Sequence, residues 1–234
     1  MLSYFKKYFL PCELILWCAS SGLIVLCFII FDRTNYPTLL ASLLGVTSLI
    51  FSAKASPLGQ LLMILFSIAY GIISYSFCYY GEMITYLGMT MPMSVFSLIA
   101  WLKNPSSAGR AEVRVNTITK REMVSMCFAT AAVTMVFYFI LRHFNTANLV
   151  PSTVSVATSF AAVYLTFRRS PSFALAYAAN DIVLIILWFL ASLHNTEYIS
   201  VLACFAAFLA NDLYGFSNWC KMKKKQAADE VFSL

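Results

Sequence analysis

The stretch Lys54-Ala55-Ser56-Pro57 recurs 114 residues later as Arg168-Arg169-Ser170-Pro171. Further residues match at the same or a slightly larger offset: Pro37 with Pro151, Glu82–Ile84 with Glu197–Ile199, and Trp101 with Trp219. The growing offset indicates small insertions in the second copy. Each copy holds three apolar stretches, and internal repeats in a strongly apolar chain are typical of membrane transporters.

The composition excludes a water-soluble domain, because 61% of the residues are hydrophobic and only 11% are charged. A soluble chain carries about 25% charged residues. A helix needs about 20 mostly apolar residues to cross a bilayer. The sequence predicts eight such spans, at 13–31, 36–53, 58–80, 82–101, 123–142, 149–167, 172–193 and 198–219.

The fold class predicted is therefore an all-α integral membrane protein of eight transmembrane helices. Helices two to four and six to eight form the two repeats, helix five links them, and helix one is an additional N-terminal element. A shift of four helices keeps both repeats in the same direction across the membrane, which is the 3+1+3 plan of SWEET-like transporters. We expect one transport domain over 1–234, divided into 1–35 (first helix), 36–105 (repeat one), 106–148 (loop and linker helix), 149–222 (repeat two) and 223–234 (cytoplasmic tail).

The basic residues predict the orientation of these spans. Of the 16 Lys and Arg residues, only Arg33 and Arg142 fall on the side opposite both termini. Because positively charged loops stay in the cytoplasm, we expect both termini to be cytoplasmic. The terminal lysine-rich stretch then serves topology, and no nucleic-acid partner is expected.

Two acidic residues fall deep within predicted spans, Asp181 and Asp212, each preceded by an asparagine. A charged residue at mid-helix costs roughly 2.5–3.5 kcal/mol on insertion scales, whereas polar contacts between membrane helices average about 0.6 kcal/mol. Packing alone therefore does not account for both, and a solute-binding cavity does. The residues that share the helical faces of these two pairs are the candidate substrate-binding residues: Tyr177, Asn180, Asp181, Trp188, Asn211, Asp212, Tyr214, Asn218 and Trp219.

The absence of certain residues limits the chemical class of the ligand. No Lys or Arg lies in the interior of a predicted span, so a phosphate group would find no cation there. Aromatic walls with amide and carboxylate groups suit a flat ring, neutral or cationic, that carries hydroxyls or an amide. Seven cysteines and two histidines show no metal-ligand spacing, and neither a catalytic motif nor an ATP-binding loop is present. We expect no metal, no cofactor and no enzymatic activity.

Three stretches resemble the PnuC family of vitamin transporters. They are Tyr80–Thr90 followed by Trp101–Pro105, then Asn180–Trp188, and finally Asn211–Trp219. The resemblance spans about residues 36–225. One departure concerns the penultimate helix, where many family members carry Trp-x-x-Trp and this chain has Tyr177 and Asn180.

The resemblance implies uptake of nicotinamide riboside by facilitated diffusion in a bacterial cytoplasmic membrane, with cytoplasmic phosphorylation trapping the solute. It also implies a homo-oligomer, as a trimer. Two alternatives stay open from the sequence. One is a carrier of thiamine or another vitamin or nucleoside of the same fold, and the other is a membrane receptor or scaffold whose polar pairs only hold helices together.

Overall fold

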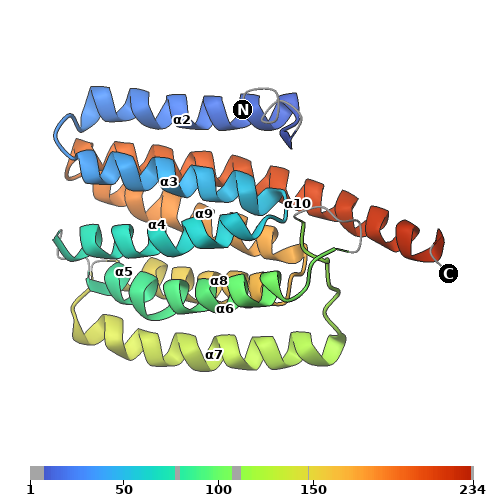
Figure 1. Cartoon of the computed structure of the whole chain (residues 1–234). Coiled ribbons are helices and arrows are strands. Elements are labelled where there is room, and N and C mark those ends of the chain that lie inside the picture. Colours follow the sequence, from blue (N-terminus) through green and yellow to red (C-terminus); the bar gives the residue numbers. More distant parts are fainter. Residues whose placement is uncertain (1–7, 77–79, 107–111, 147, 233–234) are drawn as a thin grey trace.

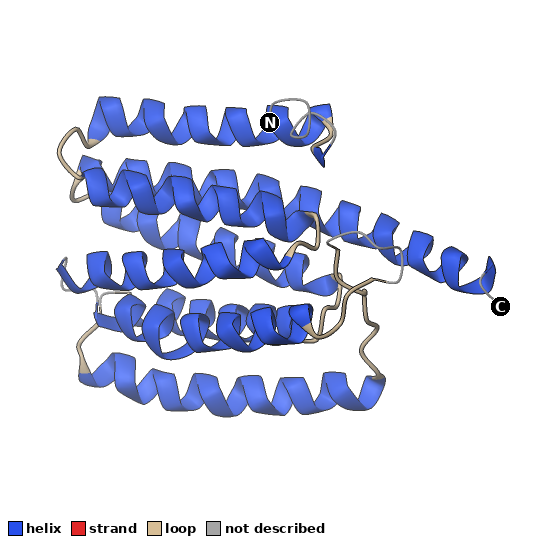
Figure 2. Ribbon diagram, in the orientation of Figure 1, coloured by secondary structure: helices blue, strands red, loops and turns tan. Residues whose placement is uncertain are grey.

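The computed structural model describes residues 8–76, 80–106, 112–146 and 148–232. This part of the chain is helical, with one isolated bridge between Pro105 and Val113 (Figure 2). The elements are α2 (Pro11–Phe31), α3 (Tyr36–Ala53), α4 (Pro57–Ser76), α5 (Tyr80–Thr85), the π-helix η1 (Tyr86–Thr90), α6 (Met91–Leu102), α7 (Lys120–His143), α8 (Leu149–Phe167), α9 (Ser172–Ser192), the short 3-10 helix η2 (Thr196–Tyr198) and α10 (Ile199–Phe232).

Eight segments of the described residues are long and apolar enough to cross a membrane, as the sequence predicts. The segment Tyr80–Leu102 is one of them and combines α5, η1 and α6. The helices lie side by side as a bundle, with α2 along one edge and α7 along the other (Figure 1). The helices between them, α3, α4, α8, α9 and α10, pack closely against their neighbours and form the centre of the bundle.

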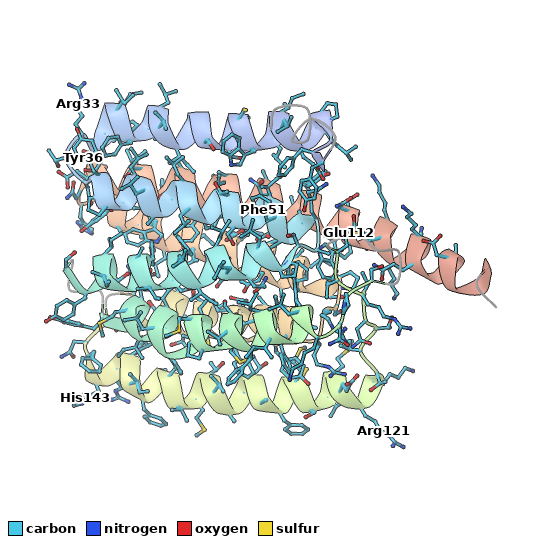
Figure 3. The ribbon with its side chains drawn as sticks, viewed as in Figure 1. Arg33, Tyr36, Phe51, Glu112, Arg121 and His143 are labelled. Atoms are coloured by element: carbon cyan, nitrogen blue, oxygen red, sulfur yellow. The ribbon has the colours of Figure 1, made fainter. Side chains whose placement is uncertain are left out.

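The two ends of the bundle differ in charge. Arg33 and His143 lie at one end, which we call the opposite end, whereas Glu112 and Arg121 lie at the other (Figure 3). We call the latter the basic end, because the loops at 54–56, 103–106, 112–119 and 168–171 meet there and α10 carries its lysines beyond it. The segregation of basic residues read from the sequence is therefore also a property of the folded bundle.

Local signals explain where several helices begin. The side chain of Asn35 accepts a hydrogen bond from the Thr38 amide at the start of α3. At the start of α7, Thr119 Oγ1 accepts from the Glu122 amide and Glu122 Oε2 accepts from the Thr119 amide. This capping box, which the sequence predicts, is confirmed.

The fourth span is interrupted by the π-helix η1, which immediately precedes α6. Pro92 lies in the first turn of α6 and has no amide hydrogen to donate to the carbonyl of Gly88, four residues earlier. The backbone widens into π-geometry where this bond is missing. Such π-segments are frequent at functional sites, because they turn side chains away from the regular helical register.

The last helix is longer than the sequence prediction, which ends the span at residue 219 and assigns 223–234 to a tail. In the structure α10 continues to Phe232. The added residues are largely Lys, Gln and Ala, which favour helix. A long-range contact holds the extension in place, since the Gln226 side chain accepts from the Val115 amide and donates to the Val113 carbonyl.

Matching residues of the two repeats make matching contacts. Trp101 Nε1 donates to the carbonyl of Thr166, and Trp219 Nε1 donates to the carbonyl of Ser52, 114 positions before Thr166. The loop at the basic end does the same, because the amides of Val113 and Asn116 donate to the carbonyls of Ala55 and Arg169, respectively. These reciprocal contacts support the predicted internal repeat, while the 3+1+3 assignment of whole helices stays a prediction.

The ion pairs follow the same correspondence. Lys54, which ends α3, pairs with Glu13 in the first turn of α2. Arg168, which ends α8, pairs with Glu122 in the first turn of α7. Helices α2 and α7 therefore each supply a glutamate to the helix that follows in the chain.

Candidate substrate-binding site

A cavity of about 30 Å³ lies within the helical bundle, enclosed by side chains from α3, α4, η1, α8, α9 and α10. We call it the central cavity. Its lining residues are Leu49, Met63, Phe66, Tyr86, Thr90, Ser159, Tyr177, Asn180, Asp181, Phe205, Phe208 and Asp212. The free volume suffices for little more than one water molecule, so a vitamin-sized solute requires the surrounding helices or side chains to move apart.

Asn180 is the most heavily hydrogen-bonded polar residue of this cavity. Its Oδ1 atom accepts from the hydroxyls of Ser155, Thr158 and Ser159, at 3.1, 2.9 and 3.0 Å. Because three donors of α8 surround the oxygen, the amide NH₂ group points away from α8. The three hydroxyls thus fix the rotamer of Asn180 and the direction of its donors.

Asp181 and Asp212 lie in this cavity on the adjacent helices α9 and α10, with their carboxyl groups next to each other. They are 3% and 5% exposed, and Asp181 Oδ2 has no hydrogen-bond partner among the described residues. Two adjacent carboxylates repel each other, and a cation beside them removes that repulsion. The arrangement is therefore suited to a cationic or hydrogen-bond-donating solute.

Aromatic rings form most of the remaining wall. Phe66 packs edge-on against Tyr86 and Phe208, with ring centroids 5.8 and 5.7 Å apart. The sequence analysis did not single out these residues, nor Thr90, Ser159 or Phe205. A usable signal existed for Tyr86 and Thr90, because Pro92 within a predicted span indicates an irregular backbone just before it.

Of the nine candidates named from the sequence, the structure brings four together in the central cavity: Tyr177, Asn180, Asp181 and Asp212. Trp188 lies elsewhere. It is buried near the opposite end, where it packs against Tyr198 with ring centroids 5.4 Å apart.

The other four candidates, all on α10, make contacts with α2, α3 and their own helix. Asn211 Nδ2 donates to Ser20 Oγ and to the Ala207 carbonyl. Tyr214 Oη donates to Glu13 Oε1 at 3.0 Å. Asn218 and Trp219 donate to the carbonyls of Ala53 and Ser52, both at 2.8 Å. In this conformation their polar atoms therefore connect helices.

Beyond the two acidic residues that the sequence analysis placed deep within spans, Glu13 and Glu82 also have shielded carboxylate oxygens. Glu13 is fully buried on α2, where it accepts hydrogen bonds from Lys54 Nζ, Tyr214 Oη and the Leu10 amide. Glu82 lies on α5, and its Oε2 atom is buried. Both stand within two residues of a helix start, so hydropathy alone does not separate them from loop residues.

The chain is similar in sequence to known membrane transporters. Residues 35–221 match the sequence model of a family described as nicotinamide mononucleotide transporter. A nicotinamide riboside transporter PnuC of Neisseria mucosa is 27% identical over 203 residues, which cover 85% of this chain and 77% of that protein. A nicotinamide riboside transporter PnuC of Haemophilus influenzae is 21% identical over 192 residues, 82% of each chain.

A solved structure shares the fold. The crystal structure described as that of the vitamin B3 transporter PnuC superposes with a TM-score of 0.82. The match covers 97% of this chain and 99% of that chain at 24% sequence identity. The eight-helix arrangement is therefore one that an experimental structure also adopts.

Proposed function

This chain belongs to the nicotinamide mononucleotide transporter family, and we propose that it carries nicotinamide riboside across a membrane by facilitated diffusion. The observation that carries the proposal is the lining of the central cavity. It combines five aromatic residues with Asn180 and two aspartates, and its described lining contains neither Lys nor Arg.

The solute chemistry fits that lining. Nicotinamide riboside has a flat cationic pyridinium ring, a carboxamide and ribose hydroxyls. Aromatic faces attract a cationic ring, and the carboxyl groups of Asp181 and Asp212 offset its charge. We propose that Asn180 and Tyr177 orient the solute through their amide and hydroxyl groups.

The family description names the mononucleotide, whereas the two relatives are named for the riboside. The two ligands differ by one phosphate group. A phosphate is bound in proteins mainly by Arg, Lys or clustered backbone amides, and Asp181 and Asp212 would repel it. The lining therefore favours the riboside.

This selectivity also supplies a direction for transport. We propose that neither ATP nor an ion gradient drives the carrier and that phosphorylation in the cytoplasm removes the riboside from the exchangeable pool. The product is then a poor ligand for the same cavity. Passive exchange thereby becomes net uptake.

The placement in the membrane follows from charge. We propose that the basic end faces the cytoplasm of a bacterial cell, which puts both chain termini there. The lipid-facing surface of α7 carries exposed Phe128, Met135 and Phe139, as expected for a helix at the edge of the bundle. We further propose a homo-oligomer, as a trimer, which chemical cross-linking of the purified protein would test.

Uptake into proteoliposomes tests the function. Purified protein should admit radiolabelled nicotinamide riboside down its concentration gradient, at the same rate with and without proton or sodium gradients. Unlabelled thiamine in tenfold excess should leave this uptake unchanged. Absence of flux in liposomes that contain folded protein would support a receptor or scaffold, and strong inhibition by thiamine would support another vitamin as the solute.

A further inference from the structure

Glu82 is a half-buried acid on α5 that the site described above does not use. Its Oε2 atom is shielded from solvent and has no hydrogen-bond partner among the described residues. Glu13 is the instructive contrast, because Lys54 Nζ, Tyr214 Oη and the Leu10 amide all donate to it. In the described residues Glu82 has no such charged donor, and its polar neighbours are tyrosine hydroxyls. A shielded carboxylate oxygen without a cation beside it costs stability, so contacts between helices do not explain Glu82.

Glu82 lies where an open cavity meets a narrow one. A cavity of about 400 Å³ at the opposite end, which we call the vestibule, is lined by Gly81, Glu82, Thr146, Asn148, Ser152, Leu187, Ala191, His194, Asn195 and Tyr198. A narrow cavity of about 20 Å³ shares Gly81, Glu82 and Ser152 with it. The vestibule is of the size that small-molecule sites have.

The narrow cavity continues toward the bundle centre. Its lining also contains Tyr86 and Ser159, and both of these residues line the central cavity as well. The vestibule, the narrow cavity and the central cavity therefore follow one another in a series, because each shares lining residues with the next. Along this series α8 presents a row of hydroxyls, from Ser152 through Ser155 to Ser159.

Aromatic rings flank this series beside Glu82. The carboxyl group of Glu82 lies close enough to the hydroxyls of Tyr70 and Tyr86 to interact with them electrostatically. The two tyrosine rings pack with centroids 4.6 Å apart at 53°. A carboxylate beside two tilted aromatic rings is a favourable setting for an organic cation, because the charge and the ring faces both attract it.

We propose that Glu82 is a specificity-determining residue, which draws the cationic ring of the solute from the vestibule into the route toward Asp181 and Asp212. The inference rests on the proposed function and deepens it, because it assigns a preference for positive charge to a second position outside the central cavity. The described vestibule lining supports this role, since it holds no Lys or Arg and Glu82 is its acidic residue.

The decisive variant is Glu82→Gln, which removes the charge and keeps the shape. Its control is Glu197→Gln, which removes a charge from an exposed residue at the same end that lines none of the three cavities. Initial rates of labelled nicotinamide riboside uptake are measured in proteoliposomes over a range of concentrations. The uncharged dihydro form of nicotinamide riboside, which has nearly the same shape, is measured as a competitor.

For Glu82→Gln we expect the KM for the cationic riboside to rise at least tenfold, while the inhibition constant of the uncharged form changes less than twofold. Glu197→Gln should match the wild type for both probes. An unchanged KM in folded Glu82→Gln protein, or equal losses for both probes, would overturn the inference.

Two further arms complete the test. If Glu82→Gln does not fold, Glu82→Asp is used instead, because it retains the charge. This variant should keep the preference for the cationic probe within threefold of the wild type. Loss of that preference would count against the inference. The wild-type arm separates this inference from the proposed function. Wild-type protein that takes up no nicotinamide riboside rejects both, whereas normal wild-type uptake with an unaffected Glu82→Gln variant rejects the inference alone.

Discussion

Trp219 Nε1 lies 2.8 Å from the carbonyl oxygen of Ser52, and this bond joins the last helix of the bundle to the end of α3. Trp101, the counterpart of Trp219, donates in turn to the counterpart of Ser52, the carbonyl of Thr166, at 2.9 Å. The two indole rings also contact each other, with centroids 5.4 Å apart. Each half of the chain thus donates to a carbonyl at a helix end of the other half, and each of these carbonyls also accepts from the backbone amide three residues later.

Replacing either tryptophan by Phe should destabilise the protein. Each variant removes the indole donor from a helix-end carbonyl that keeps its backbone donor, so the net loss is about 0.5–1.5 kcal/mol. We expect Trp101→Phe and Trp219→Phe to lower the thermal midpoint in detergent by similar amounts. Trp17→Phe is the control, because Trp17 is 37% exposed and donates to the Thr47 hydroxyl, which itself donates to the Leu43 carbonyl. A shift for Trp17→Phe as large as for the other two would contradict this account.

The Glu13–Lys54 ion pair should be strongly coupled. The side chains are 1% and 13% exposed, so Lys54→Met leaves a buried carboxylate without its cation. Removing one partner of a buried pair costs about 3–5 kcal/mol. We expect the double variant Glu13→Gln/Lys54→Met to recover part of that loss in thermal unfolding. Lys103→Met, at an exposed position, should have no effect, and additive losses in the double variant would argue against coupling.

Asn180 and Asn211 provide a matched pair for the binding site. Asn180→Leu removes an amide of the central cavity and leaves the hydroxyls of Ser155 and Ser159 without their acceptor. We expect it to weaken nicotinamide riboside binding at least tenfold in calorimetry. Asn211→Leu alters the contact between α10 and α2 and should change affinity less than threefold. Equal losses in two well-folded variants would place the α10 face containing Asn211 in the site, as the sequence alone predicts.

Selectivity against phosphate should be measurable directly. We expect nicotinamide mononucleotide to bind at least tenfold more weakly than nicotinamide riboside, a difference of about 1.4 kcal/mol or more. The reason is the described lining of the central cavity, which offers two carboxyl groups and no basic side chain. Calorimetry with both ligands on purified protein decides this. Equal affinities would mean that Asp181 and Asp212 face away from the bound solute.

The orientation of the bundle is testable with fused reporters. Because the basic end carries the loops rich in Lys and Arg, a reporter at the C-terminus should be active only in the cytoplasm. A second reporter in the loop after α7, at residues 144–146, should be active only on the outer side. A C-terminal reporter that is active outside the cell would contradict the assignment of every loop.

Features that depend only on residues close together in the sequence could be predicted from it. The eight spans follow from hydropathy, because a helix in lipid satisfies its backbone internally and only its length and apolar character matter. The capping box at Thr119 and Glu122 is equally local. The length of α10 is not a local feature, because its last turns are held by hydrogen bonds between Gln226 and the backbone of Val113 and Val115, which lie far away in the sequence.

The candidate site shows the same division. The sequence determined that Asp181 and Asp212 stand near the same depth on adjacent helices, because helical rise and topology fix depth. Rotation of each helix about its axis, by contrast, is decided by packing between helices. Tertiary structure therefore turned Asp212 toward Asp181 but Asn211 and Tyr214 toward α2. It also brought Glu82, unremarkable in sequence at a helix start, to the junction of two cavities, because only the folded bundle sets which side chains share a void.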